Sequence, residues 1–200
     1  VTGVQTCALP IYLMYLGLDA MTQVMLEAPK MLHDQRDIIL RCLDDLDPTI
    51  RIKALELLKG MCTRKNLVST VNNMFDRAIR SPPDEEWTNM VVQTIVQTAQ
   101  RDDYEHVQDF EWYGGILLDM AQLDISHFKH GGLIERELVT ILTRVPAIRQ
   151  FGVENLSLLL SNTNILNCDI KRSTQWKILR AAAFLCGEFP MWLPDKRLAV

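Results

Sequence analysis

The stretch that decides the fold is LDDLDPTIRIKAL, residues 43–55. One helix ends at its first residues, an aspartate-rich turn follows, and a second helix begins at Pro48, where the missing N–H of proline removes no helical hydrogen bond. Asp47 stands just before this proline, in the position of a capping residue. Ala54 is small enough to let a neighbouring helix approach closely. The stretch therefore predicts two packed helices joined by a tight turn.

The same order of features returns in RVPAIRQFGV, residues 144–153, where a proline opens a helix, Ile-Arg follows and Gly152 is the small residue. A third helix of this kind is expected at Pro83. Pro48 and Pro83 are 35 residues apart, close to the period of about 40 residues that is typical of HEAT and armadillo repeats. We therefore predict an all-α chain that folds as an α-solenoid of HEAT/armadillo-like helix pairs.

Apolar residues recur every three to four positions along nearly the whole chain, which is the spacing of an amphipathic helix. No segment shows a convincing strand or hairpin pattern. The predicted helices cover about residues 12–29, 33–43, 48–61, 66–79, 84–100, 106–123, 132–144, 146–160 and 171–189.

The composition is that of a folded chain with a hydrophobic core: 48% of the 200 residues are hydrophobic and 23% are charged. The net charge of -4 argues against a surface that coats nucleic acid, so we expect no nucleic-acid partner. The longest apolar run, residues 8–18, is too short to span a bilayer. No basic residue precedes it, as one would in a secretory signal, so we expect no secretion.

The chain contains five cysteines, an odd number, and no two of them form a CxxC pair. This count and spacing favour neither a disulfide framework nor a zinc knuckle. Buried, reduced thiols of a cytosolic protein are the expected state for all of them: Cys7, Cys42, Cys62, Cys168 and Cys186.

Two clusters resemble metal sites. His127 and His130 lie near Asp124, but a third ligand at helical spacing is missing, so a solvated loop between helices is favoured. The turn that holds Asp44, Asp45 and Asp47 lacks the glycine and the downstream glutamate of a calcium loop, so helix capping is favoured there. No nucleophile elbow or phosphate-binding glycine loop occurs. We assign no catalytic residue, no cofactor-binding residue and no metal ligand, and we expect no enzyme.

Two further clusters have alternative interpretations. The aromatic patch at residues 110–113, FEWY, is interpreted as core, with Glu111 at the solvent edge. A basic group near one helix offers a site for a phosphate or a lipid headgroup, although a solvated face beside an acidic turn is favoured. This group consists of Arg51, Lys53, Lys59, Arg64 and Lys65.

Three short segments imitate sorting signals: Glu154 with Leu158 and Leu159, Tyr15 with Leu18, and Tyr113 with Ile116. Such signals act from disordered tails. Because these segments fall within predicted helices whose apolar residues belong to the core, we interpret all three as chance matches.

Several stretches in the same order resemble one family. They are YLGLDAM at residues 15–21, CLDDLDPTIRIKALELLKGM at 42–61, KNL at 65–67, FEWY at 110–113 and AAAFLCGEF at 181–189. Together they resemble the adaptin trunk, and within it the delta subunits of AP-3 adaptor complexes. A generic HEAT protein would share the Asp/Arg/Ala pattern, but not the aromatic tetrad together with the Cys-Gly-Glu-Phe ending.

This resemblance implies a function that the periodicity does not. Adaptin trunks are curved solenoids in vesicle coats, and AP-3 complexes carry cargo from Golgi or endosomal membranes toward lysosomes or vacuoles. The resemblance implies AP-3 beta, mu and sigma subunits as partners, and an Arf-type small GTPase and cargo tails bound through the complex. It also implies a cytoplasmic protein that associates peripherally with these membranes and with coated vesicles, and it implies no cofactor.

The first eleven residues, VTGVQTCALPI, lie outside this family pattern. They match, residue for residue, the translation of a common sequencing-library adapter, so we expect residues 1–11 to be a non-native leader. Residues 12–190 are expected to form the trunk segment, and residues 191–200 a C-terminal tail that is either native or a ragged truncation. The alternative for the whole chain is a free-standing HEAT-type binding module with no coat role. An enzyme would require a pocket with perturbed acid–base groups near His127 and His130.

Overall fold

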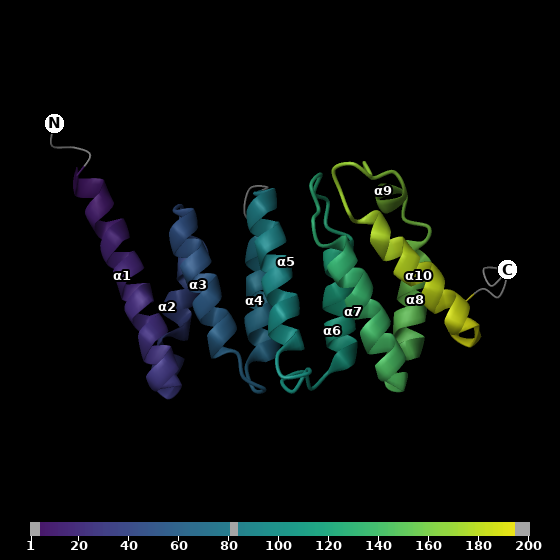
Figure 1. Ribbon diagram of the computed structural model, residues 1–200, viewed down its shortest axis with the longest axis horizontal. Helices are drawn as coiled ribbons and strands as arrows, with labels where there is room; N and C mark the ends of the chain where they lie inside the picture. The colour runs from purple at the N-terminus through teal and green to yellow at the C-terminus, as the bar shows by residue number, and fades with distance from the viewer. Residues whose placement is uncertain (1–4, 81–83, 195–200) are drawn as a thin grey trace. The chain divides into compact units, whose positions relative to one another are not determined.

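The structure is a computed structural model that describes residues 5–80 and 84–194. Every regular element in these two ranges is helical, and helices pack on one another within each part of the chain, so the prediction of an all-α solenoid is confirmed (Figure 1). None of the described helices is long and apolar enough to cross a membrane. The chain divides into two compact units, and each is described by itself.

The first unit comprises, within the described residues, 5–80, 84 and 97–106. Its helix α1 packs on α3, and α2 packs on α3 as well. Fully buried leucine, isoleucine and methionine side chains from α2, α3 and α4 form the core of this unit. Its elements are α1 (Gln5–Glu27), the 3-10 helix η1 (Pro29–Gln35), α2 (Arg36–Cys42), α3 (Pro48–Met61), α4 (Leu67–Arg80) and the last residues of α5.

The second unit comprises residues 85–96 and 107–194 of the described chain. Helix α7 packs on α6 and α10, and α10 also packs on α8 (Figure 1). Tyr113, Phe128 and Leu117 are among its fully buried side chains. Its elements are most of α5 (Glu85–Gln100), α6 (Phe110–Ala121), α7 (Gly131–Arg144), η2 (Pro146–Ile148), α8 (Arg149–Leu159), α9 (Thr163–Leu166), α10 (Trp176–Glu188) and η3 (Pro190–Trp192).

The two stretches that predicted the fold form the expected contacts. The Oδ1 atom of Asp47 accepts a hydrogen bond from the Thr49 backbone N–H at 2.8 Å, and α3 begins at Pro48. Ala54 is 0% exposed. A Cβ atom on Gly152 of α8 would overlap the side chain of Leu142 in α7, so the small residue is what lets α8 lie this close to α7.

Three predicted helices begin later than expected, because local hydrogen bonds place their starts elsewhere. The helix expected over residues 33–43 starts as the 3-10 helix η1, and its α-helical part begins only at Arg36. The helix expected from residue 106 begins at Phe110, since the Asp109 side chain accepts from the N–H groups of Glu111 and Trp112. Residues 102–104, just before it, have positive φ and cannot continue a helix.

The helix expected from residue 171 begins at Trp176, because the Asp169 side chain accepts from the Lys171 N–H and holds residues 169–174 in a turn. The short helix α9 was not predicted. The side chain of Asn162 caps it by accepting a hydrogen bond from the Asn164 N–H. The expected turn at residues 81–83 lies outside the described residues, as do the last six residues of the tail.

The prediction of buried thiols is confirmed for Cys42, Cys62 and Cys186, while Cys168 is half-buried. All four are unpaired, and burial raises the pKa of the Cys62 thiol to about 11. The side chain of Cys7 lies outside the described residues.

Candidate functional site

The aspartate-rich turn before α3 uses its carboxylates for structure. Asp47 caps the helix, and hydrogen bonds from the hydroxyl and N–H of Thr49 lower the pKa of its carboxyl. The Oδ1 atom of Asp45 accepts from the Asp47 N–H at 2.9 Å, and the Oδ2 atom of Asp44 accepts from Nε of Arg77 at 3.0 Å. The capping interpretation is therefore confirmed at this turn.

The basic residues around α3 do not converge on one site. Lys53 forms an ion pair with Asp19 at 2.8 Å, and that hydrogen bond raises the pKa of the lysine. Arg51 pairs with Asp84 at 2.9 Å. Lys59 donates to the side-chain oxygen of Gln97 at 2.6 Å, while Arg64 and Lys65 lie exposed in the following turn. This arrangement favours a solvated helix face with separate polar partners over a single site for a phosphate or a lipid headgroup.

The prediction that the aromatic patch belongs to the core is confirmed for Tyr113 but not for the other two aromatic residues. Tyr113 is 0% exposed, and its hydroxyl donates to Oε2 of the buried Glu137 at 2.8 Å. Phe110 and Trp112 are half-buried, and Glu111 is exposed at the solvent edge as predicted.

The segments that imitate sorting signals all lie in helices, as predicted, but not all of their apolar residues belong to the core: Leu158 is 69% exposed and Tyr15 is 38% exposed. Leu159 is buried in α8, Leu18 in α1 and Ile116 in α6. Their interpretation as chance matches is consistent with this placement.

The loop of residues 122–130, which carries the two histidines, is held by the start of α5. The Asn89 side chain, 3% exposed, donates to the carbonyl oxygens of Glu85 and His127, each at 2.8 Å. Its Oδ1 atom accepts from the Lys129 N–H at 2.8 Å. The Glu85 carboxylate accepts from the N–H groups of Ser126 and His127 at 2.9 and 3.2 Å. The start of α5 therefore fixes the loop by binding both carbonyl and N–H groups of its backbone.

The same loop is held from the other side by the residues just before α10. The N–H and the hydroxyl of Thr174 both donate to the carbonyl oxygen of Phe128, at 2.7 and 2.9 Å. The buried amide of Gln175 donates to the carbonyl oxygens of Ala121 and Leu123 at 2.7 and 3.0 Å. We call Glu85, Asn89, Thr174 and Gln175, with the loop they hold, the polar junction.

Gly131 lies where the polar junction meets the start of α7. Its N–H donates to the Thr174 hydroxyl at 2.9 Å, and a Cβ atom at this position would overlap the carbonyl oxygen of Thr174. Only glycine lets the backbone of α7 approach residue 174 this closely.

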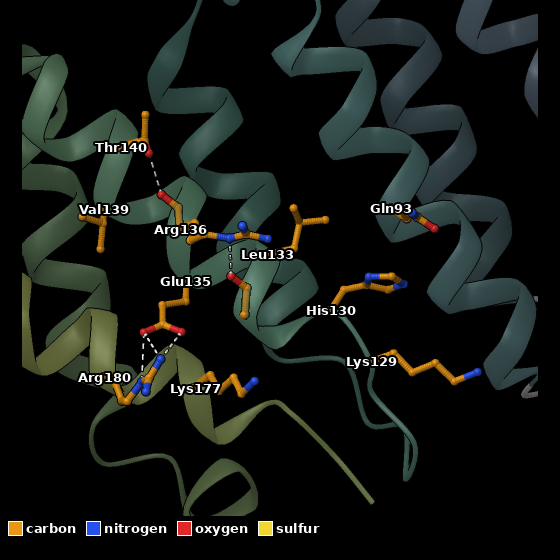
Figure 2. A pocket seen from close by; sticks show the side chains of 11 residues that line it. Gln93, Lys129, His130, Leu133, Glu135, Arg136, Val139, Thr140, Lys177 and Arg180 are labelled. Atoms are coloured by element: carbon orange, nitrogen blue, oxygen red, sulfur yellow. Dashed lines mark hydrogen bonds and ion pairs between the residues drawn. The ribbon is translucent and has the colours of Figure 1, made fainter.

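A surface hollow of about 770 Å³ opens beside the polar junction, along α7 and the start of α10 (Figure 2). We call it the basic groove, because four of its side chains are lysine or arginine. Its lining consists of Gln93, Lys129, His130, Gly132, Leu133, Glu135, Arg136, Val139, Thr140, Lys177 and Arg180.

One carboxylate neutralises one of these four cations. Arg180 binds Glu135 through two nitrogen atoms, with Nε–Oε1 at 2.9 Å and Nη2–Oε2 at 2.8 Å (Figure 2). The Nε atom of Arg136 donates to the carbonyl oxygen of Gly132 at 3.2 Å. Burial and the neighbouring Lys129 lower the pKa of His130, which favours the neutral imidazole.

The groove is lined mainly by charged and polar side chains. His130 lines it, but His127 and Asp124 do not and are exposed on the loop. The Glu135 carboxylate is held by Arg180, which leaves His130 without a carboxylate partner for acid–base work among the lining residues. No group of three potential metal ligands occurs within the described ranges.

Residues 10–200 match the family description "Adaptin N terminal region". The chain belongs to the adaptin family. It is similar to AP-3 complex subunit delta-1 of Bos taurus, with 35% identity over 183 residues, which cover 92% of this chain and 15% of that protein. It is also similar to AP-3 complex subunit delta of Dictyostelium discoideum, with 32% identity over 177 residues, 88% of this chain and 15% of that protein.

The similarity to another adaptin is shorter. AP-1 complex subunit gamma-1 of Saccharomyces cerevisiae is 28% identical over 109 residues, which cover 54% of this chain and 13% of that protein. The chain thus spans less than a fifth of the length of each of these three relatives. The resemblance to AP-3 delta subunits, first recognised from short motifs, is confirmed along nearly the whole chain.

Sequence reasoning did not find the residues that shape this region. Asn89, Thr174 and Gln175 are polar residues in segments that the sequence predicts as amphipathic helices, and no local pattern marks them as junction residues. The groove cations come from the loop, α7 and α10, so no run of basic residues signals them. The sequence signal for close backbone contact here is Gly131, the first of two adjacent glycines.

Proposed function

We propose that the chain is a segment of an AP-3 delta subunit trunk and acts as a non-enzymatic scaffold in a vesicle coat. The observation that carries this proposal is the match to AP-3 delta subunits over about nine tenths of the chain, against about half for an AP-1 subunit. The free-standing module is not favoured, because the relatives reported above are subunits of adaptor complexes.

Exposed apolar side chains support a role in assembly. On α1, Tyr12, Leu13 and Leu26 are 60%, 61% and 74% exposed. The six consecutive apolar residues 11–16 of α1 are all exposed. Contiguous exposed apolar surface marks protein contact sites. A solenoid presents such surface along its length, since each helix pair contacts only its neighbours.

The proposed partners are the AP-3 beta, mu and sigma subunits. In this proposal, an Arf-type small GTPase and cargo tails bind through the assembled complex, which associates peripherally with Golgi and endosomal membranes from the cytoplasm. Sorting of cargo toward lysosomes or vacuoles is the proposed process.

We also propose that residues 1–11 are an adapter-derived leader, 12–190 the trunk segment and 191–200 a tail. The family match begins at residue 10, so it includes only the last two residues of the proposed leader. Helix α1 nevertheless begins at Gln5 and runs on through these residues.

A segment exchange tests this function. AP-3 delta of Saccharomyces cerevisiae is 29% identical to this chain over 174 residues. We expect a yeast delta subunit whose matching segment is replaced by residues 12–190 of this chain to co-purify with the other AP-3 subunits. The control exchange uses the matching segment of AP-1 gamma-1, and we expect it to reduce recovery of the complex.

Two results would contradict the scaffold proposal. One is a chimera that is expressed at the level of wild-type delta but recovers no other AP-3 subunit. The other is equal recovery with the AP-1 gamma-1 segment, which would show that any adaptin segment suffices.

A further inference from the structure

The basic groove is lined by four lysine or arginine side chains but by only one carboxylate, that of Glu135. Lys129, Arg136 and Lys177 have no carboxylate partner among the described residues, whereas Arg180 is paired with Glu135. The chain as a whole has a net charge of -4, so this concentration of cations is a local exception on an acidic protein. Lys177 does lie over the Trp176 ring, 5.9 Å from its centre, and Arg136 donates to a backbone carbonyl, but neither contact removes the positive charge. Like charges around one hollow repel one another, and an anion between them would relieve this repulsion.

The start of α7 adds positive potential to the same hollow. His130 occupies the N-cap position without a side-chain hydrogen bond, and the first turn of α7 contains no acidic residue. The Nζ atom of Lys177 lies 3.8 Å from the point where a Cβ atom on Gly132 would be. An ammonium group beside a helix N-terminus is unfavourable by itself, because the helix dipole is positive at that end. A bound anion would reverse the sign of this interaction.

We propose that the basic groove binds a ligand that carries two or more phosphate groups. Lysine ammonium groups, arginine N–H groups and the backbone at a helix start are the usual partners of phosphate oxygens. Three cations match the charge of two or three phosphates. The volume of about 770 Å³ lies within the range of about 300 to 1,000 Å³ that is typical of small-molecule sites.

An acidic peptide fits the groove less well. Only Leu133 and Val139 offer apolar side chains among its lining residues, so a peptide would gain little apolar contact there. The cations lie on three separate segments around one hollow, which suits a compact polyanion better than an extended chain.

The test measures binding of sodium tripolyphosphate to the full 200-residue chain by isothermal titration calorimetry. The groove variant is Arg136→Gln with Lys177→Gln. The matched control is Arg64→Gln with Lys65→Gln, which removes the same charge from an exposed turn in the first unit. We expect the groove variant to raise Kd by about tenfold or more for each cation removed, since charge-assisted hydrogen bonds are lost. The control is expected to change Kd by less than about threefold.

Single substitutions guard against a variant that fails to fold. Lys129→Gln and Arg136→Gln each alter an exposed side chain, so both should leave the circular dichroism melting curve unchanged and still raise Kd. Lys177→Arg keeps the charge, and we expect it to retain binding.

A second arm distinguishes a soluble polyphosphate from a membrane lipid. Co-sedimentation is measured with phosphatidylcholine vesicles that contain one part in twenty of phosphatidylinositol 4,5-bisphosphate. Vesicle binding that is lost in the groove variant alone assigns the ligand to a lipid headgroup, and binding of tripolyphosphate without vesicle binding assigns it to a soluble compound. The proposal is overturned by absence of binding to both probes, by equal loss in the groove and control variants, or by tighter binding of poly-glutamate than of tripolyphosphate.

Discussion

Gly131→Ala is expected to lower the free energy of unfolding of the second unit by about 3 kcal/mol or more. The added methyl group would overlap the carbonyl oxygen of Thr174, and it would lie 3.0 Å from the backbone nitrogen of Gln175. Neither atom can move away easily. Thr174 is fixed by its two hydrogen bonds to the carbonyl oxygen of Phe128. Gln175 is fixed by its hydrogen bonds to the carbonyl oxygens of Ala121, at the end of α6, and of Leu123 in the loop. To make room for the methyl group, either the hydrogen bonds between Thr174 and Phe128 must break or α7 must move away from residue 174.

Thermal unfolding followed by circular dichroism measures this effect, and we expect a fall in Tm of about 10 °C. Gly132→Ala is the matched control. Its methyl group would meet only the flexible side chain of Lys177, at 3.3 Å from Cδ, while alanine gains up to about 1 kcal/mol over glycine in a helix. Equal destabilisation by the two variants would show that the close contact with Thr174 is not the cause.

Asn89→Leu is expected to have the second largest effect, a loss of about 3 kcal/mol. Leucine branches at Cγ as asparagine does but forms no hydrogen bond, so the His127 carbonyl and the Lys129 N–H both lose their partner. An unsatisfied polar group in a site that excludes water is destabilising by about 1 to 3 kcal/mol. Urea unfolding measures the total loss.

Hydrogen exchange measures the local effect of the same change. The amide of Lys129 should exchange faster in Asn89→Leu, because it donates to Oδ1 of Asn89 in the wild type. Asn155→Leu is the control, since the Asn155 amide donates to Phe151 within its own helix. Protection of the Lys129 amide that is unchanged in Asn89→Leu would contradict the role given to Asn89.

Much of the fold is predictable from the sequence because its causes are local. The cap at Asp47 and the proline at position 48 act within a few residues, so a short stretch suffices to place the start of α3. The small residue Gly152 was also identified correctly, since helix pairs of this type need a close contact at a fixed point. The helix starts at Arg36, Phe110 and Trp176 were missed, because amphipathic spacing continues through the turns that precede them.

The polar junction and the basic groove are not predictable in this way. Asn89 contacts the loop 38 residues later, and Gln175 contacts a carbonyl group 54 residues earlier. Such pairs depend on how α5, α6, α7 and α10 pack, which periodicity does not specify. The basic cluster that the sequence did suggest, around α3, is instead divided among separate ion pairs and exposed positions.

Affinity purification of the full chain from bovine cell lysate, read by mass spectrometry, tests the central claim most directly. Bovine cells are suitable because their AP-3 delta-1 subunit is 35% identical to this chain. The scaffold account predicts enrichment of AP-3 beta, mu and sigma subunits over the subunits of other adaptor complexes. Recovery of unrelated partners by a chain that unfolds cooperatively, without enrichment of AP-3 subunits, would contradict it.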